Sequence, residues 1–346
     1  MAQGHDPKGN GEPQRDLVVI GASAGGIEPL RTLVAGLPAD FPAAVLVVMH
    51  MRAGGTSALS MILDRAGRLP AVSASDGMPL EPGRIYVGRP DHHLLADPDR
   101  LVLSKGPTEN GHRPAVNALF RSAAVSAGPR TVGVVLSGAL DDGALGLRDI
   151  ADRGGTTVVQ DPHDALYSGM PASALRLVTA DHVVPAAAIA DVLVKVVGQV
   201  VELQDAAEPS PSMVLEDKIA RDGMRPVRRR TGNHDVALEF SCPDCNGTLA
   251  EVEPDSGAYR CRVGHAWSQD ALLTAQDDEL RRALWIALRS LDEKGALARK
   301  MVSQALDRGQ DALRERFGEI RRESESAAEV LRQFLLSIED TTESAS

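Results

Sequence analysis

The N-terminal half of the chain alternates short, continuous apolar runs with stretches of helical periodicity. The apolar runs occupy residues 17–20, 45–49, 132–136 and 156–159, and they lack the polar alternation of half-exposed strands. Such runs are typical of strands buried on both faces of a parallel sheet. Because helical stretches separate them, the pattern predicts an α/β fold with a doubly wound, mostly parallel sheet over residues 16–200.

Three shorter apolar runs interrupt this alternation, at residues 84–87, 94–96 and 101–103. The last two flank the turn residues Asp97-Pro98-Asp99, and we interpret all three as short antiparallel insertions. Residues 186–197 have helical spacing and predict the last helix of the domain.

The flanking regions differ in composition from this domain. Residues 1–15 are polar and rich in Gly and Pro, which predicts a disordered N-terminus. Residues 201–238 carry charges and prolines with little periodicity, which predicts a linker with one short helix around residues 213–221.

The C-terminal region, residues 269–340, repeats apolar residues in alternating steps of four and three, with Gly309 at the expected turn. This spacing predicts an antiparallel helical hairpin or a coiled coil. The two apolar stripes could bury each other, or they could bind a partner or a second copy, and the sequence favours neither interpretation.

Composition narrows the class of protein. The formal net charge of −11 argues against nucleic-acid binding, which depends on Lys and Arg neutralising phosphates. The chain has no apolar stretch near the ~20 residues that span a bilayer, so we expect no membrane insertion. Three cysteines, two of them in C-x-x-C, do not resemble a secreted disulfide framework, and we predict a cytoplasmic protein.

Ser23 lies in a small-residue turn, Gly21 to Gly26, between the first apolar run and a helical stretch. A strand–turn–helix of this kind exposes a serine hydroxyl at the carboxyl end of a strand, where a nucleophile is needed. The turn also resembles a dinucleotide-binding G-x-G-x-x-G, but Ser23 occupies the position of the middle glycine. By itself the turn fits a catalytic role and a phosphate-binding role equally.

Two other strand ends carry a base and an acid. His50 follows the second buried run, and Asp141 and Asp142 follow the run that ends at Leu136. Parallel strands end at a common edge, so His50 could activate Ser23 and an aspartate could orient His50. Alternatively, His50 only caps a strand end and the aspartates only form a turn. Three such residues at three strand ends favour catalysis.

The same three strand ends carry a family resemblance. Residues 20–26 (IGASAGG), 48–51 (VMHM) and 136–143 (LSGALDDG) resemble the catalytic domain of the CheB family of chemotaxis receptor methylesterases, as do residues 160–162 and 169–171. The resemblance extends over a little more than half of the chain, residues 16–200.

This resemblance implies a role for each residue: Ser23 as nucleophile, His50 as general base and then acid, and Asp142, which directly precedes a glycine, as the orienting carboxylate. It implies hydrolysis of glutamyl methyl esters on chemotaxis-type receptors, and glutamine deamidation through the same intermediate, with no cofactor for catalysis. The best-known members carry a phosphoacceptor receiver domain first, and we expect none here, because only about fifteen polar residues precede the first strand. A signalling adaptor without activity, or an esterase for another methyl ester, are the alternatives.

A separate cysteine-containing segment, residues 239–268, predicts a metal site. Cys242 and Cys245 form a C-x2-C pair, and Cys261 and His265 form a C-x3-H pair. Three thiolates and an imidazole complete a tetrahedral set, which a segment with little apolar core needs for folding. The spacing therefore predicts a structural zinc with all four positions filled by protein; free or redox-active thiols are the alternative.

Overall fold

The computed structural model describes residues 12–51, 54–55, 57–203, 207–221, 240–254 and 256–343. The chain forms two compact units that divide between Leu272 and Leu273. The first unit contains the α/β domain and the Cys-rich segment, and the second contains most of the C-terminal helices.

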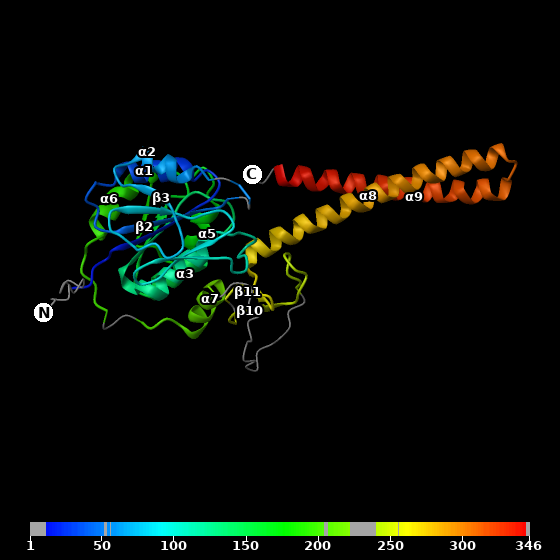
Figure 1. Ribbon diagram of the computed structural model, residues 1–346. Coiled ribbons are helices and arrows are strands. Elements are labelled where there is room, and N and C mark those ends of the chain that lie inside the picture. The colour runs from blue at the N-terminus through cyan, green and yellow to red at the C-terminus, as the bar shows by residue number, and fades with distance from the viewer. Residues whose placement is uncertain are drawn as a thin grey trace. The chain divides into compact units, whose positions relative to one another are not determined.

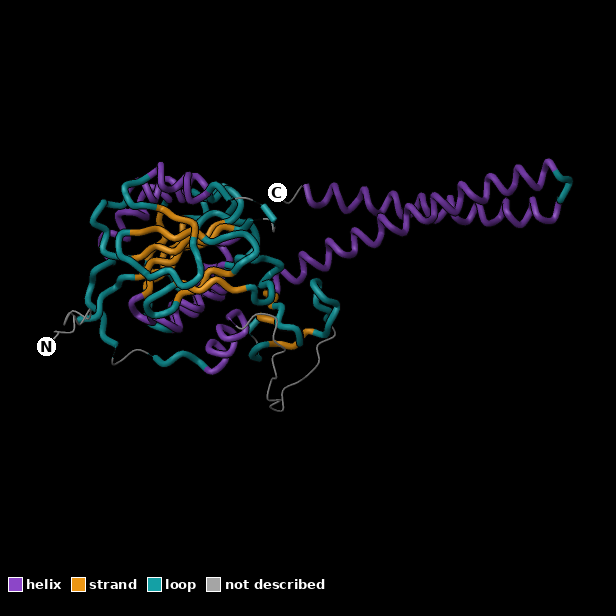
Figure 2. The backbone as a smooth tube through the Cα atoms, in the orientation of Figure 1, coloured by secondary structure: helices purple, strands orange, loops and turns teal. Residues whose placement is uncertain are grey.

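A seven-stranded sheet forms the centre of the first unit (Figures 1 and 2). Its order is β3-β4-β2-β1-β7-β8-β9, and every pair of neighbouring strands is parallel. The sequence of apolar runs predicted this doubly wound, parallel sheet, and the prediction is confirmed. The strands are β1 (Leu17–Ala22), β2 (Ala44–Met49), β3 (Ala71–Ser73), β4 (Arg84–Val87), β7 (Thr131–Val135), β8 (Thr156–Gln160) and β9 (His182–Val184).

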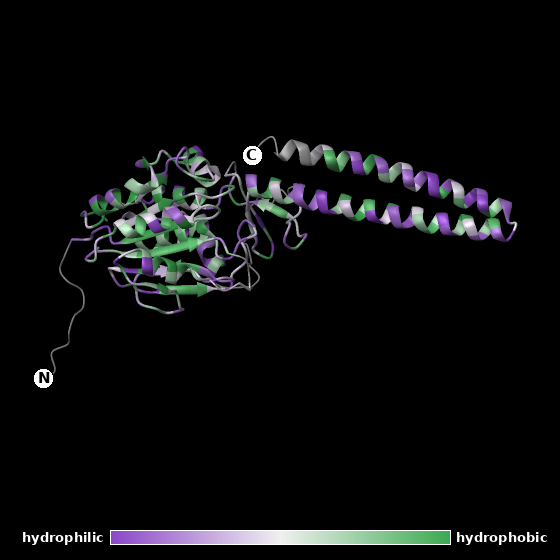
Figure 3. Cartoon of the chain, turned by 90° about the horizontal axis from the view of Figure 1, so that it is seen from above, coloured by the Kyte–Doolittle hydropathy of each residue, from purple (hydrophilic) through white to green (hydrophobic). Residues whose placement is uncertain are grey.

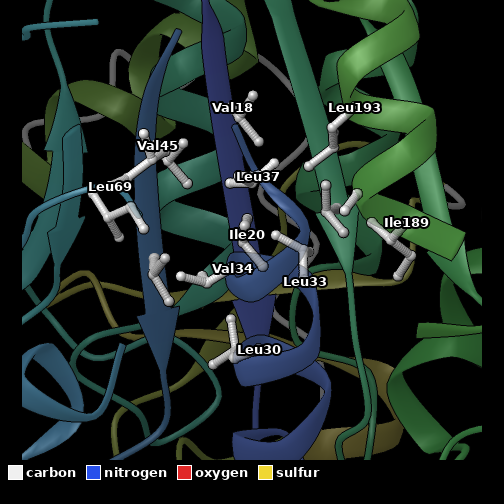
Figure 4. Packing of buried hydrophobic residues seen from close by; sticks show 14 of the residues in the cluster. Val18, Ile20, Leu30, Leu33, Val34, Leu37, Val45, Leu69, Ile189 and Leu193 are labelled. Carbon is white, nitrogen blue, oxygen red and sulfur yellow. The ribbon is translucent and has the colours of Figure 1, made fainter. Parts of the chain in front are cut away.

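Helices cover both faces of the sheet, which explains why β1 is buried along its whole length. Helices α1 (Ile27–Gly36), α2 (Leu59–Ala66) and α6 (Ala186–Val196) contribute to one core. In that core Ile20 of β1 lies near Leu33 and Val34 of α1 (Figure 4). Helices α3 (Val116–Ala127), α4 (Ala144–Asp152) and α5 (Gly169–Leu177) contribute to the core on the opposite face. A short 3-10 turn, Gly128–Arg130, joins α3 to β7.

The prediction for residues 84–87 was wrong. These residues form β4, a parallel member of the main sheet between β2 and β3. Three of its four residues are buried, because helices cover both faces of the sheet there too. The other two runs form the predicted antiparallel pair, β5 (His93–Ala96) and β6 (Leu101–Ser104). The sequence interpretation did not include β3 and β9, which have three residues each.

Helix α7 (Pro211–Arg221) confirms the short helix that the sequence suggested after the α/β domain. It packs on the domain rather than standing free: Met213 is buried in the core beneath α3, and Arg221 donates a hydrogen bond to the carbonyl of Ala96 at 2.7 Å. Gln14, expected in a disordered N-terminus, instead pairs with Val200. Residues 1–11 lie outside the described residues, as do residues 204–206 and 222–238 of the predicted linker.

The Cys-rich segment forms a three-stranded antiparallel sheet of β10 (Leu249–Glu251), β11 (Ala258–Cys261) and β12 (Ala266–Ser268). It is small, and its buried apolar side chains are Leu249, Trp267 and the two cysteines Cys242 and Cys261.

The predicted helical hairpin is present as α8 (Gln269–Asp307) and α9 (Asp311–Glu343), with Gly309 at φ +66° in the turn. Apolar residues recur among polar ones along both helices (Figure 3), and Leu288, Ala328 and Leu335 form the buried centre. The ion pairs Asp292–Arg332 and Arg299–Glu325 confirm the antiparallel arrangement. Within the described ranges, no helix has the length and apolarity needed to cross a membrane.

Candidate active site

Ser23 follows β1 directly and begins the turn into α1. Gly25 adopts φ +70°, a conformation that glycine accepts without steric cost and that turns the chain into the helix. The Ser23 N–H donates to the carbonyl of Ser137 at 2.9 Å, which ties the turn to the end of β7. Gly138 lies so close that a Cβ there would be 2.9 Å from the Cβ of Ser23. The serine is therefore held between the ends of two neighbouring strands.

His50 reaches Ser23 from the adjacent strand β2. Ala22 and Met49 are partners in the parallel register of β1 and β2, and the His50 N–H donates to the carbonyl of Ala22 at 3.2 Å. This register places the imidazole Nδ1 2.9 Å from the hydroxyl oxygen of Ser23. Strand β1 has β2 on one side and β7 on the other, so the sheet grows in opposite directions from β1. Ser23 and His50 lie at the carboxyl ends of β1 and β2, at this switch point. Open α/β sheets bind their ligands at such a point.

Asp142 completes the arrangement from the loop between β7 and α4. Its Oδ2 lies 2.7 Å from Nε2 of His50, so Nε2 carries the proton and Nδ1 is free to accept one from Ser23. Asp142 also accepts hydrogen bonds from the N–H groups of Val116, at 2.7 Å, and Asn117, at 3.0 Å, in the first turn of α3. Burial alone would raise the pKa of this carboxyl group, but hydrogen bonding and the charges of nearby histidines hold it below its usual value.

Asp141, the other aspartate in this loop, faces a different partner. Its Oδ1 accepts a hydrogen bond of 2.7 Å from the hydroxyl of Ser268 in the Cys-rich segment. Burial raises the pKa of Asp141 to about 6, partly opposed by that hydrogen bond. The structure therefore brings Ser23, His50 and Asp142 together and leaves Asp141 out of the triplet.

Two further residues support the triplet, and the sequence interpretation did not include them. The imidazole of His112 stacks on that of His50, with ring centroids 3.7 Å apart and an interplanar angle of 16°. Burial, with a further contribution from His50, lowers the pKa of His112 to about 4, so this ring is neutral near pH 7. The side-chain oxygen of Asn117 accepts the N–H groups of Gly143 and Gly146, both at 2.9 Å, and so fixes the loop that carries Asp142. The one local signal was Gly111 and Pro114 flanking His112, which mark a turn.

A cavity of about 570 Å³ opens beside Ser23. Ile27, Pro29, Met49 and Leu166 supply much of its apolar lining, and Gln160 supplies a polar group. This cavity gives a substrate access to Ser23.

The four predicted metal ligands also come together. The ligand atoms of Cys242, Cys245, Cys261 and His265 all lie within 4.8 Å of one another. Nδ1 of His265 is 3.7 Å from the Cys242 sulfur and 3.5 Å from the Cys261 sulfur, and the sulfurs of Cys245 and Cys261 are 3.6 Å apart. A tetrahedron with zinc–sulfur bonds of about 2.3 Å has edges of about 3.8 Å, so the donor set has the right size for a tetrahedral metal ion. Hydrogen bonding to Cys242 and His265 outweighs burial and lowers the pKa of the Cys261 thiol well below its usual value.

The fold and the triplet together define a doubly wound α/β protein with a Ser–His–Asp site at the carboxyl edge of its parallel sheet. The family model for CheB methylesterase matches residues 18–193, which include all three members of the triplet. The chain belongs to the CheB methylesterase family.

Individual relatives agree with this assignment. A protein-glutamate methylesterase/protein-glutamine glutaminase of Methanosarcina mazei is 39% identical over 191 residues, which are 53% of this chain and 52% of that protein. One from Geobacter metallireducens is 42% identical over 170 residues, 49% of each chain. The CheB methylesterase catalytic domain of Thermotoga maritima is 35% identical, with a TM-score of 0.51 over 53% of this chain and 98% of that one. The chain thus spans about half the length of the curated relatives it matches.

Proposed function

We propose that the chain is a serine-dependent protein-glutamate methylesterase in which Ser23, His50 and Asp142 form the catalytic triad. The observation that carries the proposal is the continuous hydrogen-bonded relay, 2.9 Å from Ser23 to His50 and 2.7 Å from His50 to Asp142. A serine hydroxyl needs a base within this distance to act as a nucleophile, and the base needs an orienting acceptor.

In the proposed reaction the Ser23 oxygen attacks the carbonyl carbon of a glutamyl methyl ester, and the hydroxyl proton passes to Nδ1 of His50. Asp142 stabilises the imidazolium that forms. The N-terminal end of α1, which begins at Ile27 next to the serine, favours the negative charge on the tetrahedral intermediate. The carbon–oxygen bond to the methoxy group then breaks, and the His50 imidazolium gives its proton to the departing methoxy oxygen, which leaves as methanol. Water, deprotonated by His50, attacks the acyl-enzyme and releases the glutamate carboxylate and the serine.

The proposed substrate is a methylated glutamate on a chemotaxis-type receptor, and the proposed second substrate is a receptor glutamine. The names of the Methanosarcina mazei and Geobacter metallireducens relatives include both activities. Deamidation uses the same acyl-enzyme, with ammonia leaving instead of methanol. No cofactor takes part in this chemistry. The cytoplasm is the proposed compartment, because a cluster of three thiols needs reducing conditions.

The test is methanol release from methylated receptor membranes by the wild-type protein, by Ser23→Ala, and by Ser303→Ala, which alters an exposed serine of α8. We expect release from the wild type and from Ser303→Ala, and none above background from Ser23→Ala. A serine-directed fluorophosphonate should label Ser23 in the wild type and in Ser303→Ala, and should not label Ser23→Ala. Release that is unaffected by Ser23→Ala contradicts the triad. Absence of both release and labelling in the wild type contradicts the esterase and favours an adaptor.

We also propose that Cys242, Cys245, Cys261 and His265 bind a structural zinc ion. The tetrahedral spacing of the donors and the small apolar core of the segment support this. When bound, zinc would cross-link the two ends of the segment and would have no position open for chemistry. Elemental analysis should find about one zinc per chain, falling to near zero in a Cys242→Ser/Cys261→Ser variant. Metal-free wild-type protein with a fully folded segment would contradict the assignment.

A further inference from the structure

The Cys-rich segment is hydrogen-bonded to the loop that precedes α3, residues 108–115. The Asn110 N–H donates to the carbonyl of Ala266 at 2.8 Å, and the Ala266 N–H donates to the carbonyl of Thr108 at 3.1 Å. The Ser268 N–H donates to the side-chain oxygen of Asn110 at 2.8 Å. Glu109 of the loop and Ala266 of β12 therefore form a parallel β-bridge.

The residues that make these contacts lie next to the proposed metal ligands. Ala266 directly follows His265, and Asp244, which lies between Cys242 and Cys245, accepts a 2.7 Å hydrogen bond from the hydroxyl of Thr108. Residues next to both the C-x2-C pair and the C-x3-H pair thus form hydrogen bonds with the same loop. A metal ion that fixes the four ligands also fixes the positions of Asp244 and Ala266.

A buried ionic cluster joins the same two parts. Arg260, which directly precedes Cys261, pairs with Glu216 of α7 and lies 3.7 Å from Glu109 in the loop. Glu109 also pairs with Arg121 of α3, and all four side chains are almost fully buried. Removing one partner from a buried ion pair leaves an uncompensated charge, which strongly destabilises the arrangement. Displacement of Arg260 would therefore disturb Glu109 and the loop around it.

The C-terminal part of the same loop, together with the start of α3, contacts residues of the active site. It turns at Asn110 and Gly111, which have φ of +51° and +70°, and then presents His112 to the ring of His50. Four residues later α3 begins, and the first two N–H groups of that helix hold Asp142. Ser268 makes a second connection, through its hydrogen bond to Asp141.

We propose that the Cys-rich segment is a metal-dependent positioning element. Binding of a metal ion by its Cys3His set would keep residues 108–117, the loop and the first two residues of α3, ordered. These residues in turn hold the side chains of His50 and Asp142 in position. The proposal rests on the proposed esterase and zinc functions. Loss of the metal would release Asp244, Ala266 and Arg260 from the loop, so His112 would no longer be held against His50. The active site would lose alignment although no triad residue contacts the metal ligands.

The first experiment measures amide hydrogen exchange in metal-loaded full-length protein and after removal of the metal with a chelator, confirmed by elemental analysis. We expect exchange in residues 108–117 to become roughly tenfold faster or more, with no comparable change in β1, β2 and β7, and reversal when zinc is restored. Unchanged exchange in residues 108–117 overturns the proposal. An equal increase in all of these elements also overturns it, because it would show general destabilisation.

The second experiment uses Thr108→Val, which removes one hydrogen bond to Asp244 and leaves every ligand in place. The control is Thr248→Val, the same change at an exposed position of the segment. We expect unchanged metal content in both, and about fivefold faster exchange at the amides of residues 110–112 in Thr108→Val alone. Fluorophosphonate labelling of Ser23 should be slower in that variant. Identical exchange in the two variants contradicts the coupling. Because exchange requires no catalysis, a failure of the esterase proposal would appear only in the labelling.

Discussion

Replacing Asp142 with asparagine tests how the triplet is held. The carboxylate accepts three hydrogen bonds, from His50 and Val116 at Oδ2 and from Asn117 at Oδ1. Asparagine has one side-chain oxygen, so its NH2 group must face a donor whichever way the amide is turned. With NH2 toward His50, Nε2 must become the acceptor, and the proton moves to Nδ1, where it blocks transfer from Ser23. With NH2 toward Asn117, two N–H donors meet at 3.0 Å.

Each orientation leaves one buried N–H group without an acceptor, that of Val116 in the first and that of Asn117 in the second, and the first orientation also abolishes general-base catalysis. A triad with the wrong tautomer loses about 10⁴-fold in kcat in serine proteases, and an unsatisfied buried donor costs about 1–3 kcal/mol. We therefore expect Asp142→Asn to lower methanol release by about 10³ to 10⁴-fold and to reduce the free energy of unfolding in urea by about 1–3 kcal/mol.

Asp141→Asn is the matched control. It keeps an oxygen to accept the hydroxyl of Ser268 and does not touch His50. We expect its turnover to stay within a few-fold of wild type. If Asp142→Asn turned over within about threefold of wild type, or if Asp141→Asn were the more damaging change, the assignment of Asp142 as the orienting group would be refuted.

Three other changes test separate parts of the molecule. His112→Ala removes the ring stacked on His50, and we expect kcat to fall about tenfold with little change in KM; His112→Phe should recover most of it, and failure to do so would argue against the stack. Burial raises the pKa of Asp149 from 3.8 to about 7, so the native protein keeps a proton that the unfolded chain releases. The stability that this group contributes is fully present below pH 3.8 and is lost as the pH rises through 7, by up to about 4 kcal/mol. Urea unfolding of Asp149→Asn should consequently depend less on pH than that of wild type, and parallel profiles would refute the shift. In the hairpin, Leu288→Ala should lower the local opening free energy of α8, measured by amide exchange, by about 2–5 kcal/mol, whereas Ile286→Ala, at a half-exposed position, should change it little.

The sequence was sufficient to predict four adjacent strands of the main sheet, β2, β1, β7 and β8, and the strand ends that carry the triplet. Continuous apolar runs separated by helices require strands buried on both faces, and parallel strands must end at one edge. Ser23, His50 and the pair Asp141–Asp142 follow three such runs, so the runs implied their proximity, and the resemblance to the CheB family selected Asp142. The spacing of the C-x2-C and C-x3-H pairs likewise predicted that their four side chains come together, because a tetrahedral site needs four donors on two short loops.

Only the tertiary structure decided what surrounds these residues. The N–H groups that hold Asp142 come from α3, 25 and 26 residues earlier in the chain, and nothing local to Asp142 indicates them. The stacking of His112 on His50 and the attachment of the Cys-rich segment to the same loop are likewise contacts between distant segments. Residues 84–87 were assigned wrongly for the same reason: an apolar run does not show which strands it pairs with, or in which direction. Local patterns determine which side chains are buried, whereas strand partners and loop contacts depend on the path of the whole chain.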